Sequence, residues 1–238
     1  MSADTTELTF TLLTKADQGA ELLHVAYERI MRPSFVPDEL PGPNSLTPGS
    51  GASVLIAKDR DTGTPLGLAR LLTGNGDGVA LLEYLAADPQ VRGRGIGAAL
   101  LSRCREIWSE AGELVVLAEV HDPRIHAESE HEHPAARLRF YERHGARLLG
   151  LPWTQPALGP ETQRVEGMLL LVMYADPKRV TTELERRVVH DWARAYFEAA
   201  ETGASHRSTA QVLLTLAAGG PLQIGPIADL DRLVPLPA

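Results

Sequence analysis

Two arginines and three glycines alternate in one short stretch, Arg92-Gly93-Arg94-Gly95-Ile96-Gly97. Glycine lets a backbone come close to a bound anion, and the guanidinium groups of Arg92 and Arg94 stay charged at any physiological pH. Apolar residues then recur at helical spacing as far as Ala111, and Gly112 suits a helix end. A helix that begins at such a turn presents unpaired N–H groups and the positive end of its dipole. The stretch therefore predicts an anion site; the alternative is a basic surface turn before an ordinary amphipathic helix.

Two familiar phosphate-binding motifs do not fit this turn. It lacks the GKS or GKT ending of a nucleotide P-loop. It does not open the chain, as a dinucleotide fingerprint usually does, and no acidic residue ends a strand about 20 residues later in the expected way. Both interpretations are set aside.

The elements around the turn can be predicted from hydrophobic periodicity and turn chemistry. The predicted strands cover 7–13, 53–58, 65–72, 79–87, 114–120, 146–152 and 166–175. The predicted helices run from a cap at Thr14 and Asp17 to about Met31, and over 96–111, 134–144, 180–200 and 208–218. The strands between 53 and 87 form a predicted antiparallel meander. Strand 79–87, the following helix and strand 114–120 form a predicted right-handed parallel crossover.

The glycine turn resembles the acetyl-CoA signature of the GNAT acyltransferase superfamily, R/Q-x-x-G-x-G/A, at Arg92, Gly95 and Gly97. The preceding Leu85–Pro89 is similar to the LAVDP strand end of that family, with alanine where valine is usual. A second family element, Phe-Tyr-Glu-x-x-Gly, is matched by Phe140–Gly145. Two elements in the right order are much more specific than either one alone.

The resemblance covers about residues 7–175 and implies an α/β fold of the GNAT type, a mixed, largely antiparallel central sheet flanked by helices. It implies N-acetyl transfer from acetyl-CoA, the co-substrate, to a primary amine of a small molecule. The CoA pyrophosphate would lie on the turn, and the pantetheine would bond to the backbone at the end of strand 79–87. The residues implied in cofactor binding are Leu85, Ala86, Ala87, Arg92, Gly93, Arg94, Gly95, Ile96, Gly97 and Ala98.

Three side chains are candidates for the proton transfers of such a reaction. Glu83 faces the same side of its strand as the position where the family holds the thioester, and a buried carboxylate with a raised pKa suits a general base. The alternative is that Glu83 pairs with a nearby arginine such as Arg70. Glu119, on the neighbouring strand, is the rival base and substrate anchor. Tyr141 is implied as the general acid for the thiolate, and the alternative for it is a core-facing aromatic.

A second hypothesis keeps the fold but not the catalysis. The chain would then be a catalytically weak acyl-CoA-binding GNAT module with a structural or regulatory role. Glu83 and Tyr141 favour the enzyme, because such a module would not need them.

The chain is predicted to divide into a GNAT acetyltransferase domain, 1–177, and a C-terminal helical extension and tail, 178–238. Helix 180–200 is amphipathic, with Leu184, Val188 and Trp192 on its apolar face. That face is expected to pack on the core or against a sister subunit in a homodimer.

Composition limits the partners. A net charge of −8 over 238 residues argues mildly against nucleic acid and is compatible with a cationic substrate. The single cysteine, Cys104, leaves no intrachain disulfide, which fits a reducing compartment. The N-terminus has no basic start or apolar segment, and no apolar run has the length of a membrane span. We expect a cytoplasmic protein that does not bind membranes.

Two loops contain further residues that could bind a metal ion or the acceptor amine. Residues 121–134 contain four histidines, but their spacing matches no structural zinc pattern and no cysteine is nearby, so no metal is expected. This acidic loop can instead attract an amine. In the Pro-rich loop 33–53, the resemblance implies that Phe35, Asp38 and Glu39 line the acceptor site; the alternative is a solvated loop.

Overall fold

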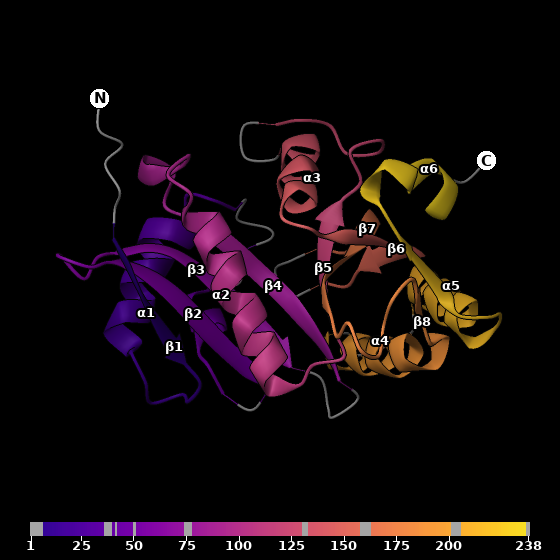
Figure 1. The fold of residues 1–238 in the computed structure, drawn as a ribbon, viewed down its shortest axis with the longest axis horizontal. Coiled ribbons are helices and arrows are strands. Elements are labelled where there is room, and N and C mark those ends of the chain that lie inside the picture. Colours follow the sequence, from indigo (N-terminus) through magenta and orange to yellow (C-terminus); the bar gives the residue numbers. More distant parts are fainter. Residues whose placement is uncertain are drawn as a thin grey trace. The chain divides into compact units, whose positions relative to one another are not determined.

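The computed structural model describes residues 7–35, 40, 42–49, 51–73, 78–129, 133–157, 163–200 and 206–236 (Figure 1). The chain forms two compact units. The first comprises Met1–Thr73 and Leu82–Ile107, and the second comprises Gly74–Leu81 and Trp108–Ala238. These units are defined by packing and do not test the division into residues 1–177 and 178–238, which stays a prediction.

The first unit contains an antiparallel meander with strand order β1-β2-β3-β4. Its elements are β1 (Leu8–Leu13), α1 (Ala20–Ala26), the π-helical η1 (Tyr27–Met31), the 3-10 helices η3 (Pro43–Leu46) and η4 (Pro89–Val91), β2 (Ala52–Asp59), β3 (Pro65–Thr73), the greater part of β4 (Val79–Ala87), and α2 (Ile96–Ala111) up to Ile107. Strand β4 and helix α2 have the predicted bounds, and the predicted meander is confirmed.

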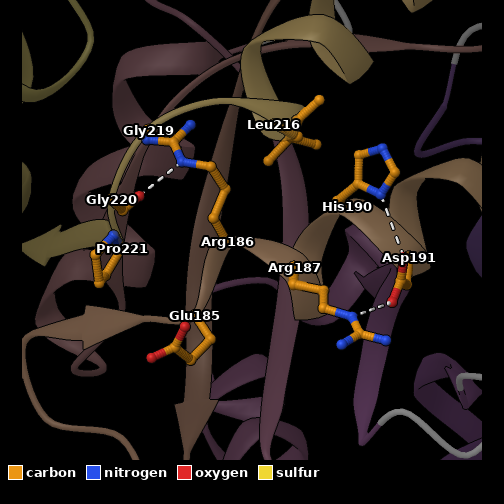
Figure 2. A pocket seen from close by; sticks show the side chains of 10 residues that line it. Glu185, Arg186, Arg187, His190, Asp191, Leu216, Gly219, Gly220 and Pro221 are labelled. Carbon is orange, nitrogen blue, oxygen red and sulfur yellow. Dashed lines mark hydrogen bonds and ion pairs between the residues drawn. The ribbon is translucent and has the colours of Figure 1, made fainter.

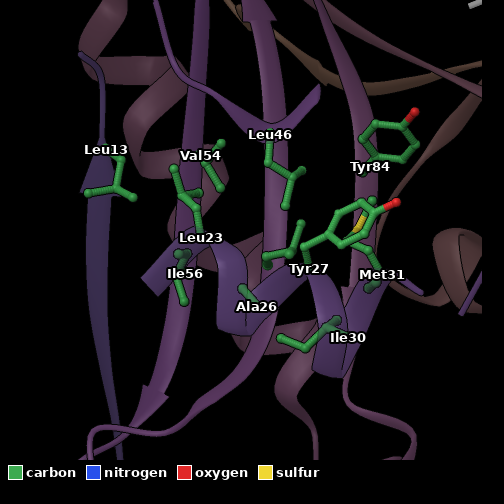
Figure 3. Packing of buried hydrophobic residues seen from close by; sticks show 12 residues of the cluster. Leu13, Leu23, Ala26, Tyr27, Ile30, Met31, Leu46, Val54, Ile56 and Tyr84 are labelled. Atoms are coloured by element: carbon green, nitrogen blue, oxygen red, sulfur yellow. The ribbon is translucent and has the colours of Figure 1, made fainter. Parts of the chain in front are cut away.

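An apolar cluster joins the first helix to the meander (Figure 3). Ala26 and Ile30, on α1 and η1, are fully buried together with Val54 and Ile56 of β2. Figure 3 shows these side chains facing one another between the helix and the strands, with Tyr84 of β4 in the same cluster. The helix therefore covers the meander and fixes the strand whose end carries the glycine turn.

The predicted cap of the first helix is wrong. Helix α1 begins at Ala20, after Gly19 in the left-handed conformation (φ 64°), with no side-chain cap. The Gln18 side chain accepts hydrogen bonds from the N–H groups of Thr14 and Lys15 at 3.0 and 3.2 Å. A glycine can enter the helix from this conformation without steric strain, so the turn does not need a threonine or aspartate cap.

The second unit contains a mixed sheet with strand order β4-β5-β7-β6-β9-β8, to which β4 contributes its first residues. Its elements are β5 (Val115–His121), α3 (Pro134–Arg143), β6 (Arg147–Gln155), β7 (Val165–Ala175), β8 (Glu183–Leu184), α4 (Arg186–Ala200), α5 (Arg207–Ala217), β9 (Leu222–Gly225), the 3-10 helix η5 (Ile227–Asp229) and α6 (Leu230–Leu233). Val79–Leu81 pair with Val115–Leu117 in parallel, and the other pairings are antiparallel. The predicted mixed, largely antiparallel sheet is confirmed.

The C-terminal segment departs from its predicted structure. The predicted helix from 180 begins only at Arg186, because Glu183–Leu184 form strand β8 and pair with β9. Strand β9 in turn pairs with β6 through Leu148 and Leu149. The last part of the chain therefore holds a strand of this sheet and helix α6. The C-terminal residues are built into the second unit (Figure 1).

None of the helices in the described ranges is both long and apolar enough to cross a membrane.

Candidate active site

The glycine turn between β4 and α2 is open to solvent. Gly93 and Gly95 have φ angles of 83° and 79°, a region that favours glycine, and a Cβ atom at either position would have no neighbour within 4 Å. Arg92 and Arg94 are both exposed. An anion could therefore approach the backbone here without displacing a side chain.

The first turn of α2 supplies donors to this open surface. The N–H of Ala99 is the first in the helix to bond back to the turn, to the Gly95 carbonyl oxygen at 3.0 Å. The amides of residues 96–98 bond to no acceptor in the part of the chain that the structure describes. Three N–H groups and the helix dipole thus converge beside two arginines, which is a favourable arrangement for a phosphate group.

A buried carboxylate anchors the turn to the first unit. Asp88, at the end of β4, accepts hydrogen bonds from the N–H of Gln90 at 2.9 Å and from Nε of Arg29 at 2.5 Å. Its own N–H donates to the Leu66 carbonyl oxygen at 2.9 Å. The sequence analysis treated Asp88 as part of a strand end and missed Arg29, which lies 59 positions away in the chain.

A glycine in β3 lets α2 pack closely on the sheet. A Cβ atom at Gly67 would lie 2.7 Å from Cγ2 of Ile96 and 2.9 Å from Cδ1 of Leu100. It would also lie 3.1 Å from the Ala86 carbonyl oxygen. Because Ile96 is the first residue of α2, Gly67 helps set the position of the three free amides. The sequence analysis did not single out this residue.

Glu83 forms an ion pair with Arg70 on β3. The two side chains are 12% and 14% exposed, so water screens the pair only weakly. This is the arrangement that the alternative interpretation of Glu83 anticipated. The ion pair occupies Oε2 of Glu83, and the role of this residue as a base stays a prediction.

Glu119 of β5 lies in a polar cluster of the second unit. Its Oε1 accepts a hydrogen bond from Nε1 of Trp153 at 2.5 Å. Its Oε2 accepts from Nε2 of Gln155 at 3.0 Å and from the Tyr196 hydroxyl at 2.9 Å. Burial raises the pKa of Glu119, although the three hydrogen bonds act in the opposite direction. The residue as a whole is half-buried.

Stacked aromatic rings hold the donors of this cluster. The ring of Trp192, on α4, lies 5.5 Å from that of Trp153 at an angle of 21°. It also lies 5.3 Å from the ring of Tyr196 at an angle of 6°. Periodicity placed Trp192 on the apolar face of its helix, but it could not show that this helix contributes a side chain to the cluster around Glu119.

Tyr141 of α3 is buried, with its ring 5.4 Å from that of Phe140 in an edge-on arrangement. Burial raises the pKa of Tyr141, although the charge of Arg137 lowers it. The phenol is therefore protonated at neutral pH. Within the described residues its hydroxyl makes no hydrogen bond, which leaves the proton available to a ligand.

The structure says less about the roles of the remaining predicted site residues. At the end of β4, Ala86 is buried and Leu85 and Ala87 are half-buried, and their contact with pantetheine stays a prediction. Phe35 packs edge-on against Tyr84 with ring centres 5.3 Å apart, so it belongs to the apolar cluster of the first unit. The other two predicted acceptor-site residues of that loop lie outside the described residues; they are Asp38 and Glu39.

The described histidines of the loop 121–134 do not form one cluster. The rings of His121 and His126 lie 4.4 Å apart, and Nε2 of His126 is 2.8 Å from the Glu166 carbonyl oxygen. Nδ1 of His133 instead contacts Glu128 at 2.7 Å. His131 lies outside the described residues. Among those that are described, no three His, Cys, Asp or Glu side chains are grouped to hold a metal ion.

Cys104 lies on the inner face of α2 and is fully buried. Burial raises the pKa of its thiol to about 12. The thiol is therefore protonated and unreactive near neutral pH, in agreement with a core role.

A pocket at the start of α4 is lined mainly by charged and small residues (Figure 2). Arg186 donates to the carbonyl oxygens of Gly220 and Thr215, both at 2.7 Å, and so holds the end of α5. Asp191 contacts His190 at 3.2 Å and Arg187 at 3.5 Å. Figure 2 shows these groups turned toward one another or toward the backbone, which is typical of a packing junction.

Comparison with known families identifies the domain. The family model described as "Acetyltransferase (GNAT) domain" matches residues 50–145. The similarity to a GNAT acetyltransferase domain thus extends over less than half of the 238 residues. The match includes the glycine turn, Glu83, Glu119 and Tyr141, and it ends before β6 and the C-terminal helices. The matched part of the chain is thus similar to the acyltransferases of this family.

One solved structure of a GNAT-family protein shares the fold, and two others match with lower TM-scores. A protein described as a GNAT-family acetyltransferase, from Bacteroides thetaiotaomicron, matches 83% of this chain and 99% of its own at 20% identity, with a TM-score of 0.59. A GNAT-family protein from Desulfovibrio desulfuricans matches 71% of this chain and 100% of its own, with 20% identity and a TM-score of 0.49. The Escherichia coli ribosomal-protein-S18-alanine N-acetyltransferase matches 73% and 99%, with 16% identity and a TM-score of 0.49. A search of curated proteins found no match to this GNAT chain.

Proposed function

We propose that this GNAT domain binds acetyl-CoA at residues 92–98 and transfers the acetyl group to the primary amine of a small molecule. The observation that carries the proposal is the set of three free amides at the start of α2, beside two exposed arginines. Such amides bind phosphate oxygens well, because they are already oriented and lose little freedom on binding. The pantetheine arm would follow the backbone of residues 85–87, as the family resemblance implies.

The reaction needs one proton acceptor and one proton donor. The amine nitrogen attacks the thioester carbonyl carbon, the bond between carbon and sulfur breaks, and the amine gives up a proton. A general base takes that proton, and a general acid returns one to the leaving thiolate. The acetyl group thus passes to nitrogen, and free CoA is released.

We assign the base to Glu119, the rival candidate of the sequence analysis. Its raised pKa brings its proton affinity closer to that of a base working near neutral pH. A carboxylate has about four acceptor positions, and Oε1 of Glu119 has only the Trp153 bond in the described residues. Oε1 therefore keeps acceptor positions that an amine could use. Glu83 is the second candidate, because Arg70 already neutralises its charge.

Tyr141 is the proposed general acid. Its buried, protonated hydroxyl has no partner in the described ranges that would compete for the proton. A phenol is also a stronger acid than water, so it can protonate a thiolate without a large energetic penalty.

The test is thiol release from acetyl-CoA across a panel of small primary amines, followed as initial rate against pH. Glu119→Gln should lower the rate roughly 10²–10⁴-fold, and Glu83→Gln should lower it less. Glu110→Gln, at an exposed position of α2, is the matched control and should behave as the wild type. If Glu83→Gln abolishes turnover while Glu119→Gln retains it, the base is Glu83. If no amine supports release although acetyl-CoA binds, the chain is the catalytically weak module instead.

A further inference from the structure

We propose that Tyr196 of α4 positions the Glu119 carboxylate, so that the C-terminal helix is a working part of the acetyl-acceptor site. The inference rests on the proposed function of Glu119 as base. It adds a residue that lies 51 positions beyond the end of the family match at residue 145, counting from 145 to 196.

The contact itself is a hydrogen bond that bridges distant segments. The Tyr196 hydroxyl donates to Oε2 of Glu119 at 2.9 Å, across 77 positions of the chain. Gln155 donates to the same oxygen at 3.0 Å. Two donors on Oε2 hold one edge of the carboxylate, and they leave Oε1 as the more available proton acceptor.

The ring of Tyr196 is held firmly in place. It lies nearly parallel to the Trp192 ring, at 6°, and 6.3 Å from the Trp153 ring at 18°. Trp153 also donates to Glu119. The aromatic stack and the carboxylate thus form one connected unit, in which α4 supplies two of the three stacked rings.

Other titratable groups near the cluster make their contacts elsewhere. The described interactions that shift the pKa of Glu119 are burial and the three hydrogen bonds. His121 of β5 stacks on His126, which contacts the Glu166 backbone of β7. The charged residues of α4 near Tyr196 pair among themselves, as His190 with Asp191 and Arg194 with Glu198. On β6, Arg147 donates to the Thr181 carbonyl oxygen. Among the described side chains of α4, the Tyr196 hydroxyl donates to Glu119.

The proposal predicts opposite effects of two changes at residue 196, one that removes the hydroxyl group and one that makes it a stronger donor. Tyr196→Phe keeps the ring stack but removes a hydrogen bond that favours the ionised carboxylate, so the pKa of Glu119 should rise. The acid limb of the pH–rate profile should move to higher pH, and the rate on that limb should fall about tenfold. 3-Fluorotyrosine at position 196 is a stronger donor and should move the limb to lower pH. The KM for acetyl-CoA should not change with either.

A second readout does not depend on turnover. The carboxyl carbon of Glu119, labelled with ¹³C and assigned with Glu119→Gln, is titrated by NMR in the wild type, in Tyr196→Phe and in Tyr174→Phe. Tyr174 of β7 packs against Trp108 of α2 and is the matched control. A higher midpoint in Tyr196→Phe alone supports the proposal, even if no acceptor amine has been found.

Two results would overturn it. One is a folded Tyr196→Phe variant, with a wild-type melting temperature, whose Glu119 titration and acid limb both match the wild type. The other is a shift in the same direction for Tyr196→Phe and for 3-fluorotyrosine, since that would point to general loosening of the stack. Loss of activity in Glu83→Gln alone would refute the assignment of the base but would leave the NMR result interpretable.

Discussion

Replacing Gly67 by alanine should damage both stability and cofactor binding. The new Cβ atom would lie 2.7 Å from Cγ2 of Ile96 and 2.9 Å from Cδ1 of Leu100, and both distances are too short for carbon atoms. Ile96 is β-branched and therefore stiff, and the Ala86 carbonyl oxygen at 3.1 Å blocks a shift toward β4. Helix α2 must then move away from the sheet. Overpacking of this kind lowers the free energy of unfolding by about 1–3 kcal/mol.

The same movement should displace the free amides of residues 96–98. Loss of one hydrogen bond to a charged phosphate costs about 1.5–3 kcal/mol, which raises the Kd for acetyl-CoA roughly 10- to 150-fold. Urea unfolding and calorimetric titration measure the two effects. Gly49→Ala is the matched control, because a Cβ atom there meets nothing within 4 Å.

A double variant identifies the cause. Ile96→Ala removes the Cγ2 methyl that clashes, so Gly67→Ala and Ile96→Ala together should destabilise the protein less than the sum of the single changes. The reasoning is refuted if Gly67→Ala unfolds and binds acetyl-CoA like Gly49→Ala. Full additivity in the double variant would also count against it.

Three further predictions follow from the second unit. Trp192→Ala should lower the free energy of unfolding by about 3–5 kcal/mol, measured by urea unfolding, because the ring is buried and contacts the rings of both Trp153 and Tyr196; a loss below about 1 kcal/mol would contradict the packing. Because the folded state raises the pKa of Glu119, its contribution to stability is present at acid pH and is lost as pH rises through the folded-state value. The free energy of unfolding of Glu119→Gln should therefore increase relative to that of the wild type from about pH 4 upward. If the difference between the two free energies does not change with pH, the pKa of Glu119 is not raised. Tyr141→Phe should lower turnover while calorimetry finds the Kd for acetyl-CoA nearly unchanged, and equal turnover would exclude Tyr141 as the acid.

The parts of the fold that could be predicted are those with local causes. Strand β4 and helix α2 have their predicted bounds because apolar periodicity and a glycine turn lie within a few residues of each other. The cap of α1 was wrong, because a left-handed Gly19 can start a helix as well as a polar side chain can. Strand β8 was missed because its two residues become a strand only when β9, nearly 40 positions later, pairs with them.

In the candidate site, too, only the features with local causes could be predicted from the sequence. The turn from Arg92 to Ala98 could be read from adjacent residues. The partners of Glu119 lie 34 to 77 positions away, and no periodicity can show which distant side chain meets a given carboxylate. Gly67 has a role only because α2 packs on β3, so its signal is tertiary. Sequence patterns therefore located the glycine turn and named the carboxylates, and the structure distinguished the environments of Glu83 and Glu119.

The central claim is that acetyl-CoA binds at the turn, and calorimetric titration of Gly95→Glu tests it most directly. Gly95 has a φ angle of 79°, so any side chain there adds backbone strain, and Gly95→Ala serves as the control for that strain alone. The account predicts measurable binding to the wild type, weaker binding to Gly95→Ala, and none to Gly95→Glu, whose carboxylate would repel the pyrophosphate. Equal affinity of the wild type and Gly95→Glu would contradict it.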